Sequence, residues 1–182
     1  ADPLARWREL AGRAALSLAP SQLAGVPVQG DATLAGAGDA STATLRLVSG
    51  VNQLTAELKP QQATATLEAP ALPALAPLWA LLPPSASAWV PRTGAVNVQA
   101  TLAGTLAQPR WHLQARGSGL QSAQGSLNKV ALEARGEIGT GPLNLDAPLT
   151  LSLNGEGLVA GGGRLDTLRA TFEGSPRRHQ IS

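Results

Sequence analysis

Hydrophobic and polar residues alternate along most of this chain. The clearest run covers residues 143–154, in which Leu or Ala takes every odd position and a polar residue or Pro148 takes every even one. Such alternation is typical of strands with one apolar and one polar face. Similar runs separated by Gly, Pro and Asn predict about ten short antiparallel strands in a meander. Fully extended, residues 143–154 would span about 40 Å, so we expect an edge or a bend at Pro148, which cannot donate a ladder hydrogen bond.

One segment departs from this period of two. Residues 70–84 read PALPALAPLWALLPP, with large apolar residues at helical spacing and prolines at both ends. We therefore expect one short helix near residues 71–82 that covers an open end or edge of the sheet. Residues 85–94 are expected to form a loop that leads back into the strands.

Composition narrows the possible classes of protein. The 182 residues include no Met and no Cys and begin with Ala1, so we expect a piece of a longer protein or a mature form, without disulfides or thiolate metal sites. No apolar run is long enough for a membrane helix. Although the pI is about 9.9, the net charge is only +2 and charged residues make up 14% of the chain. Basic residues are not clustered and aromatic residues are few, so nucleic-acid binding is not expected.

Catalytic and metal-binding patterns are weak. His112 and His179 lie far apart in the sequence and have no neighbouring acids, so neither a general base nor a metal site is indicated. Residues 126–129 match S-x-x-K, but the surrounding pattern is that of a strand and not of a helix. Glu133 and Glu137 alternate with apolar residues and are expected to face water. We expect no enzymatic activity, no cofactor and no metal.

Three interpretations of the apolar strand faces remain open. The first is a closed sandwich with an ordinary core, although one Phe, four Trp and no Tyr provide few large side chains to fill it. The second is a structural or adhesive β-solenoid of a secreted bacterial surface protein. The third is an open, curved sheet whose apolar concave face holds lipid tails. Alternation alone does not separate these three.

A further indication comes from the order of strands and glycines in residues 102–182. GTLAQP (104–109) is followed by a strand, by GL (119–120) and by the leucine ladder 143–153. The segment EGSPRRHQI (173–181) then supplies a Gly, a short loop, a His and a new strand. This order resembles the TamB family, whose members are the large periplasmic subunits of the translocation and assembly module and belong to the wider AsmA-like group.

The resemblance also covers residues 10–83 and implies how the chain is organised. The chain would be a single fragment of a longer, repetitive β-groove protein, with a first repeat-like segment at 10–83 that ends in the short helix and a second at 94–182. The strand patterns of residues 26–69 and 94–138 are independently similar to each other. The implied fold is all-β: an elongated antiparallel sheet curled into an open β-taco, or trough, with a hydrophobic interior.

The same resemblance implies a function and a location. Members are implicated in phospholipid transport to the outer membrane and in the assembly of autotransporters and other outer-membrane proteins. The chain would then work in the periplasm of a Gram-negative bacterium, anchored in the inner membrane by a segment outside it. Its partners would be phospholipid or another amphiphile, the outer-membrane barrel protein TamA and nascent outer-membrane β-strands.

The candidate groove residues are the apolar members of the alternating runs. They are Leu45, Leu47, Leu54, Leu58, Leu67, Val96, Val98, Leu102, Leu113, Val130, Leu132, Ile138, Leu143, Leu145, Leu149, Leu151, Leu153, Leu168 and Phe172. An open trough would also have unpaired strands at its two edges, and we expect these edges to associate between molecules.

Overall fold

One antiparallel sheet forms almost all of this computed structural model, which describes residues 11–81, 90–105, 108–137, 147–175 and 178–181. Its eleven strands are hydrogen-bonded in the order in which they occur in the chain. The strands are β1 (Ala11–Leu23), β2 (Val26–Ala37), β3 (Thr42–Ser49), β4 (Asn52–Lys59), β5 (Gln62–Ala69), β6 (Thr93–Thr105), β7 (Gln108–Gln121), β8 (Gly125–Glu137), β9 (Leu149–Ala160), β10 (Gly163–Ser175) and β11 (Arg178–Ile181).

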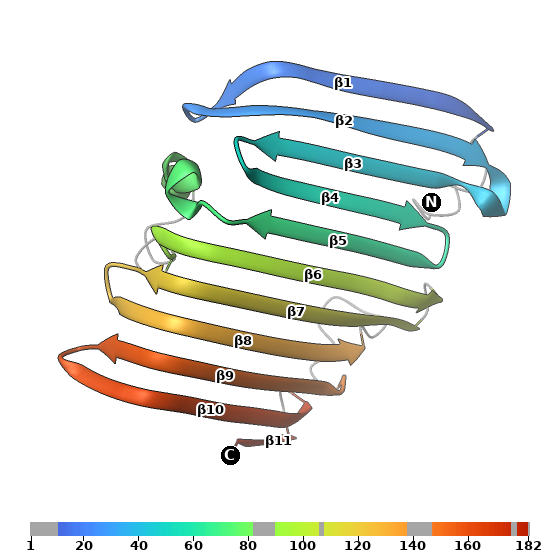
Figure 1. Ribbon diagram of the computed structural model, residues 1–182. Coiled ribbons are helices and arrows are strands. Elements are labelled where there is room, and N and C mark those ends of the chain that lie inside the picture. The colour runs from blue at the N-terminus through green and yellow to red at the C-terminus, as the bar shows by residue number, and fades with distance from the viewer. Residues whose placement is uncertain (1–10, 82–89, 106–107, 138–146, 176–177, 182) are drawn as a thin grey trace.

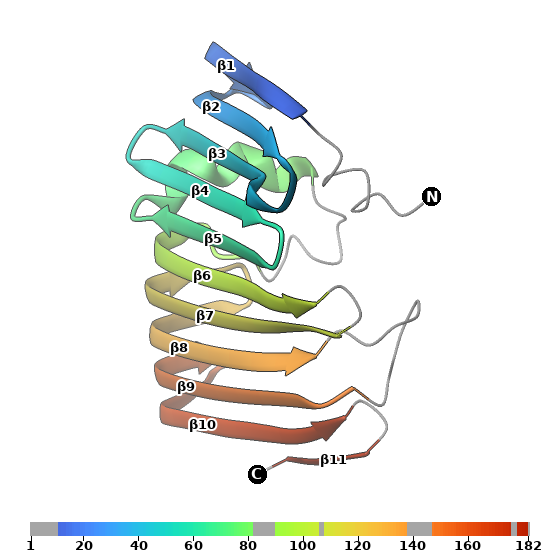
Figure 2. The same cartoon turned by 90° about the vertical axis from the view of Figure 1, so that its right-hand side faces the viewer.

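The sheet is curled and open. Strands β1 and β11 form its two edges and do not pair with each other, and Figures 1 and 2 show the curved strands stacked from one end of the molecule to the other. At about 4.8 Å between neighbouring strands, the path from β1 to β11 is about 48 Å long. The predicted all-β fold, an elongated antiparallel trough with a hydrophobic interior and one short helix, is confirmed.

Several strands are longer than the sequence pattern predicts. Strands β6, β7 and β8 have 13, 14 and 13 residues, whereas the pattern predicts short strands. Strand β7 continues through Gly119, whose φ is 61°, and β9 continues through Gly157, whose φ is 65°. Glycine adopts this left-handed conformation at little cost. The strand can therefore continue beyond a residue at which the alternation of apolar and polar side chains is interrupted.

The second half of the alternating run 143–154 forms the beginning of strand β9. The strand begins at Leu149, directly after Pro148, so this proline lies at the edge of the strand. The carbonyl oxygen of Pro148 accepts a hydrogen bond from the backbone N–H of Glu137 at 3.3 Å. The first half of the run, residues 143–146, lies outside the described residues.

The short helix lies where the sequence predicts it. Helix η2 (Leu72–Leu81) has 3₁₀ geometry and contains Pro77, which has no N–H to donate within the helix. It contacts β2 and β6, and Figure 2 shows it behind β3 and β4. Asn52 fixes its start, because the Asn52 side chain donates to the carbonyl oxygen of Ala71 and accepts from the N–H of Ala71, both at 3.1 Å.

Full burial is rare and is concentrated near this helix. Among the described residues, the buried hydrophobic side chains are those of Val26, Ala69, Leu72 and Ala134. Val26 begins β2, Ala69 ends β5 and Leu72 begins η2, so three of the four lie at the helix. The other apolar side chains of the sheet whose burial is described are partly or fully exposed, so no second layer built from the described residues packs against most of the apolar face. Within the described residues, no helix is long and apolar enough to cross a membrane.

Candidate functional site: an apolar groove

Strand register aligns the apolar residues into rows that run across the sheet. Residues directly opposite each other on neighbouring antiparallel strands point to the same face, so a chain of such pairs marks a continuous row along the trough. The central row consists of Leu16, Ala32, Leu45, Ala56, Ala65, Ala100, Leu113, Ala134, Leu151 and Phe172. Every strand from β1 to β10 contributes one apolar residue to it.

Two further apolar rows flank the central row. The helix-side row, nearer to η2, consists of Leu18, Gly30, Leu47, Leu54, Leu67, Val98, Ala115, Leu132, Leu153 and Ala170. The far row consists of Ala14, Leu34, Ala43, Leu58, Ala63, Leu102, Trp111, Gly136, Leu149 and Gly174. Together the three rows form an uninterrupted apolar surface along the trough.

Charged side chains lie on the other face. None of the three rows, all of whose members are described, contains an ionisable residue. The outer row next to the central one consists of Ser17, Asp31, Arg46, Thr55, Thr66, Gln99, Gln114, Glu133, Ser152 and Thr171. Exposed ion pairs such as Arg110–Glu137 at 3.3 Å and Lys129–Glu156 at 3.0 Å join neighbouring strands. Such pairs contribute little stability, but their placement separates the two faces by polarity.

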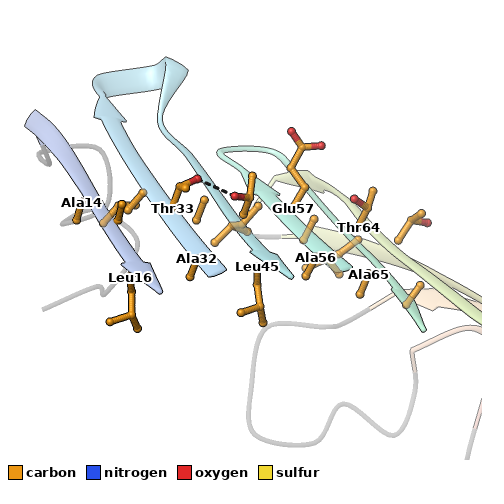
Figure 3. Close-up of a pocket in the computed structure, with 18 of the residues that line it drawn as sticks. Ala14, Leu16, Ala32, Thr33, Leu45, Ala56, Glu57, Thr64 and Ala65 are labelled. Atoms are coloured by element: carbon orange, nitrogen blue, oxygen red, sulfur yellow. Dashed lines mark hydrogen bonds between the residues drawn. The ribbon is translucent and has the colours of Figure 1, made fainter. Parts of the chain in front are cut away.

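A hollow of about 860 Å³ occupies the apolar face over β1 to β7. Figure 3 shows Leu16, Ala32, Leu45, Ala56 and Ala65 pointing to one side of the sheet, and Thr33, Glu57 and Thr64 pointing to the other. On that other side the hydroxyls of Thr33 and Thr44 are hydrogen-bonded at 2.7 Å. We call this hollow the groove. Its size is within the range of small-molecule binding sites.

Sixteen of the nineteen residues predicted to line a groove are described, and all sixteen lie on the apolar face. Of these, Leu45, Leu58 and Leu102 line the hollow itself. Leu45, Leu113, Leu151 and Phe172 belong to the central row, Leu47, Leu54, Leu67, Val98, Leu132 and Leu153 to the helix-side row, and Leu58, Leu102 and Leu149 to the far row. Val96, Val130 and Leu168 belong to a shorter fourth row with Ala69, Gly117 and Gly155. Ile138, Leu143 and Leu145 lie outside the described residues.

Sequence alternation misses a fifth apolar row. Leu120, Leu127, Leu158 and Leu165 are consecutive cross-strand partners on β7 to β10. A Cβ placed on Gly117 would lie 2.7 Å from Cδ1 of Leu120, so the Leu120 side chain covers the apolar face although it stands three positions from Gly117. Left-handed glycines at 119 and 157 accompany this change of face on β7 and β9, and the repeated pattern G-x-G-L at 117–120 and 155–158 is the sequence signal for it on these two strands.

Histidine 112 has an acidic neighbour, contrary to the sequence-based expectation. Its Nε2 lies 3.1 Å from Oε1 of Glu133. Strand pairing brings the two together from β7 and β8, which sequence separation alone does not reveal. Both side chains are exposed, at 40% and 53%, and they lie on the charged face, away from the apolar rows.

The other candidate chemistry also lies on strands. Ser126 and Lys129 both belong to β8, and the Lys129 ammonium pairs with Glu156, so the helical geometry required by an S-x-x-K nucleophile is not present here. The described residues include no group of three or more His, Cys, Asp or Glu side chains that could hold a metal ion.

The apolar groove is therefore the strongest candidate site in the described part of the chain. Comparison with protein-family models, curated proteins and solved structures finds no match to this sequence.

Proposed function

We propose that this chain is a segment of a TamB-like or related AsmA-like protein that binds the acyl chains of phospholipid along its apolar rows. The observation that carries the proposal is the continuity of the three rows from β1 to β10 without an ionisable side chain. The core of a closed sandwich does not require apolar rows that continue across every strand, whereas a path along which a hydrocarbon chain slides does.

Physical chemistry favours hydrocarbon as the occupant. Each methylene group removed from water contributes about 0.8 kcal/mol, and the apolar rows offer it no competing polar contacts. A charged ligand would find no opposite charge on the apolar rows. An extended peptide would bury backbone N–H and C=O groups there without hydrogen-bond partners. The charged headgroup would stay at the rim of the trough, in contact with water.

In this proposal the chain works in the periplasm of a Gram-negative bacterium, anchored in the inner membrane by a segment outside it. It carries phospholipid toward the outer membrane, supports the assembly of proteins such as autotransporters there, or does both. The outer-membrane barrel protein TamA is the proposed partner. The resemblance in residues 102–182 supports the location and the partner, and the apolar rows support the cargo.

A charge placed in the groove tests the proposal. Leu45 lines the groove and lies between Ala32 and Ala56 in the central row. In Leu45→Asp, a carboxylate would face the acyl chain, and we expect about a tenfold or greater loss of bound phospholipid. The measurement is mass spectrometry of lipids that co-purify with the chain, calibrated with an added phosphatidylethanolamine standard.

The matched control is Thr55→Asp, which adds the same charge to the outer face. Thr55 lies opposite Arg46, so the new carboxylate has a compatible neighbour and lipid binding should not change. Circular dichroism would verify that both variants keep their strand content. If neither the unaltered chain nor the control carries lipid, the groove does not bind phospholipid, and the interpretation as a structural or adhesive protein is favoured.

A further inference from the structure

The groove ends abruptly part of the way along the apolar face. Its described lining includes residues of every strand from β1 to β7 and none of β8 to β10, although the central row continues to Phe172. The last side chain that lines it is that of Trp111 on β7. In the far row, Trp111 lies between Leu102 on β6 and Gly136 on β8.

The indole ring of Trp111 covers Gly136. A Cβ placed on Gly136 would lie 3.0 Å from both Cζ2 and Nε1 of Trp111, and 2.8 Å from the carbonyl oxygen of Pro148. Glycine at this position therefore leaves room both for the indole ring and for the backbone carbonyl group of Pro148. The space above the far row at β8 is thus filled by a side chain that belongs to β7.

We infer that Trp111 is the end wall of the acyl-chain site and determines how far a bound chain reaches toward β9. The inference rests on the proposed function and adds a specificity-determining residue to it. The indole of Trp111 takes the place that the hydrocarbon would take over Gly136, so a bound chain stops at β7 until this ring moves.

Length and polarity are consistent with a phospholipid acyl chain on the β1 side of this wall. Seven strands correspond to a path of about 29 Å. A bilayer core about 30 Å thick holds two acyl chains end to end, or about 15 Å for each. The groove is thus about twice as long as one acyl chain, so Trp111 sets the farthest position toward β9 that a chain sliding along the groove can reach. The apolar rows contain no ionisable residue that would bind a charged end.

Photocrosslinking with a phosphatidylethanolamine that carries a diazirine at the end of one acyl chain tests the inference. In the unaltered 182-residue chain we expect adducts on groove residues such as Leu45 and Leu58, and few on Leu149 of β9. In Trp111→Ala, the space over Gly136 would be free for about two methylene groups of the acyl chain. Their burial would favour the extended position of the chain, so the yield of adducts on Leu149 should rise about tenfold. His112→Ala, on the same strand but the opposite face, should leave the distribution unchanged.

A further variant keeps the test decisive. Trp111→Leu preserves an apolar side chain if Trp111→Ala does not fold, and it should also extend the adducts to Leu149. Gly136→Ala is unsuitable for this test, because its Cβ would also clash with the backbone carbonyl oxygen of Pro148 at 2.8 Å.

The outcomes separate the inference from the proposed function. Strong adducts on Leu149 in the unaltered chain, or adducts that remain confined to β1–β7 in both Trp111 variants, would overturn the role of Trp111 and leave lipid binding intact. The absence of adducts from every variant would overturn lipid binding itself, and the inference with it.

Discussion

Glycine and alanine on the apolar face allow large side chains to lie flat against the sheet. Gly136 lies under the indole of Trp111, and a Cβ on Gly117 would lie 3.0 Å from Cγ1 of Val130. Gly30 accommodates Leu47 in the same way, since a Cβ there would lie 2.7 Å from Cδ2 of that leucine. A face built from such small–large pairs can curve inward with few bulky aromatic side chains, and the chain has a single Phe.

Gly30→Ala is expected to destabilise the sheet. Its Cβ would collide with the backbone carbonyl oxygen of Arg46 and with the Leu47 side chain, and a backbone atom cannot turn aside as a side chain can. We expect a loss of about 1–3 kcal/mol in the free energy of unfolding, measured by urea denaturation. Gly155→Ala is the matched control, because the nearest atoms to a Cβ there lie at 3.4 Å or more. Equal stability of the two variants would contradict this explanation.

Alternation in the sequence was sufficient to assign most side chains to a face, because the strand period is two wherever the backbone is regular. The assignment of Leu45, Leu67 and Leu151 to one apolar surface follows from this alone. Alternation does not predict the face of Leu120 or Leu158. Each of these leucines follows a glycine in the left-handed conformation, Gly119 or Gly157, and therefore points to the face opposite to the one that strict alternation assigns to it.

At the scale of elements, the helix and the strand ends beside it form the best-buried part of the described structure. Asn52 is only 2% exposed and holds both backbone groups of Ala71, just before η2 begins. Prolines and helical spacing predict this helix, but no sequence pattern predicts that a single asparagine in β4, 19 residues away, fixes its start. That contact depends on the curvature and register of the sheet.

Asn52→Ala is expected to loosen the attachment of η2. Both hydrogen bonds to Ala71 would be lost, and its N–H and C=O would be left without these partners, at a cost of about 2 kcal/mol. Hydrogen exchange should be faster in the amides of residues 71–79 than in the unaltered chain. Gln53→Ala, at the next position and on the opposite face, should exchange like the unaltered chain. Unchanged protection of η2 in Asn52→Ala would show that packing alone holds the helix.

At the scale of the whole molecule, no described strand pairs with the outer edge of β1 or of β11. The described side chains of β1 are exposed throughout, including Leu16 at 71%, Leu18 at 42% and Leu23 at 52%. The bulge between Leu18 and Ser21 includes Pro20, and both features commonly occur in edge strands. An exposed apolar edge of this kind favours association with another strand.

We predict that the isolated chain self-associates through this edge at high concentration. Leu18→Lys should weaken the association, because a cation at an edge opposes pairing; we expect about a tenfold higher dissociation constant in sedimentation equilibrium. Thr44→Lys adds the same charge to an interior strand and should associate like the unaltered chain. A chain that stays monomeric at millimolar concentration would exclude edge pairing.

More of the overall architecture than of the groove could be predicted from the sequence. Regular alternation and short turns specify an antiparallel meander, because neighbouring runs pair most simply with each other. The groove's end at Trp111 was not predictable, since it depends on which side chain lies over Gly136. That arrangement follows from register, which aligns positions 25 residues apart.

The sequential strand order has a consequence for how such a molecule is made and how it changes. From β1 to β11, every strand pairs only with its neighbours in the chain, so the contacts are local and each hairpin can join the sheet as soon as it has been synthesised. Addition or removal of one hairpin would alter the length by about 10 Å and leave every other pairing intact. Length is thus an independently adjustable property of this architecture, and the same local pairing can build troughs of different lengths.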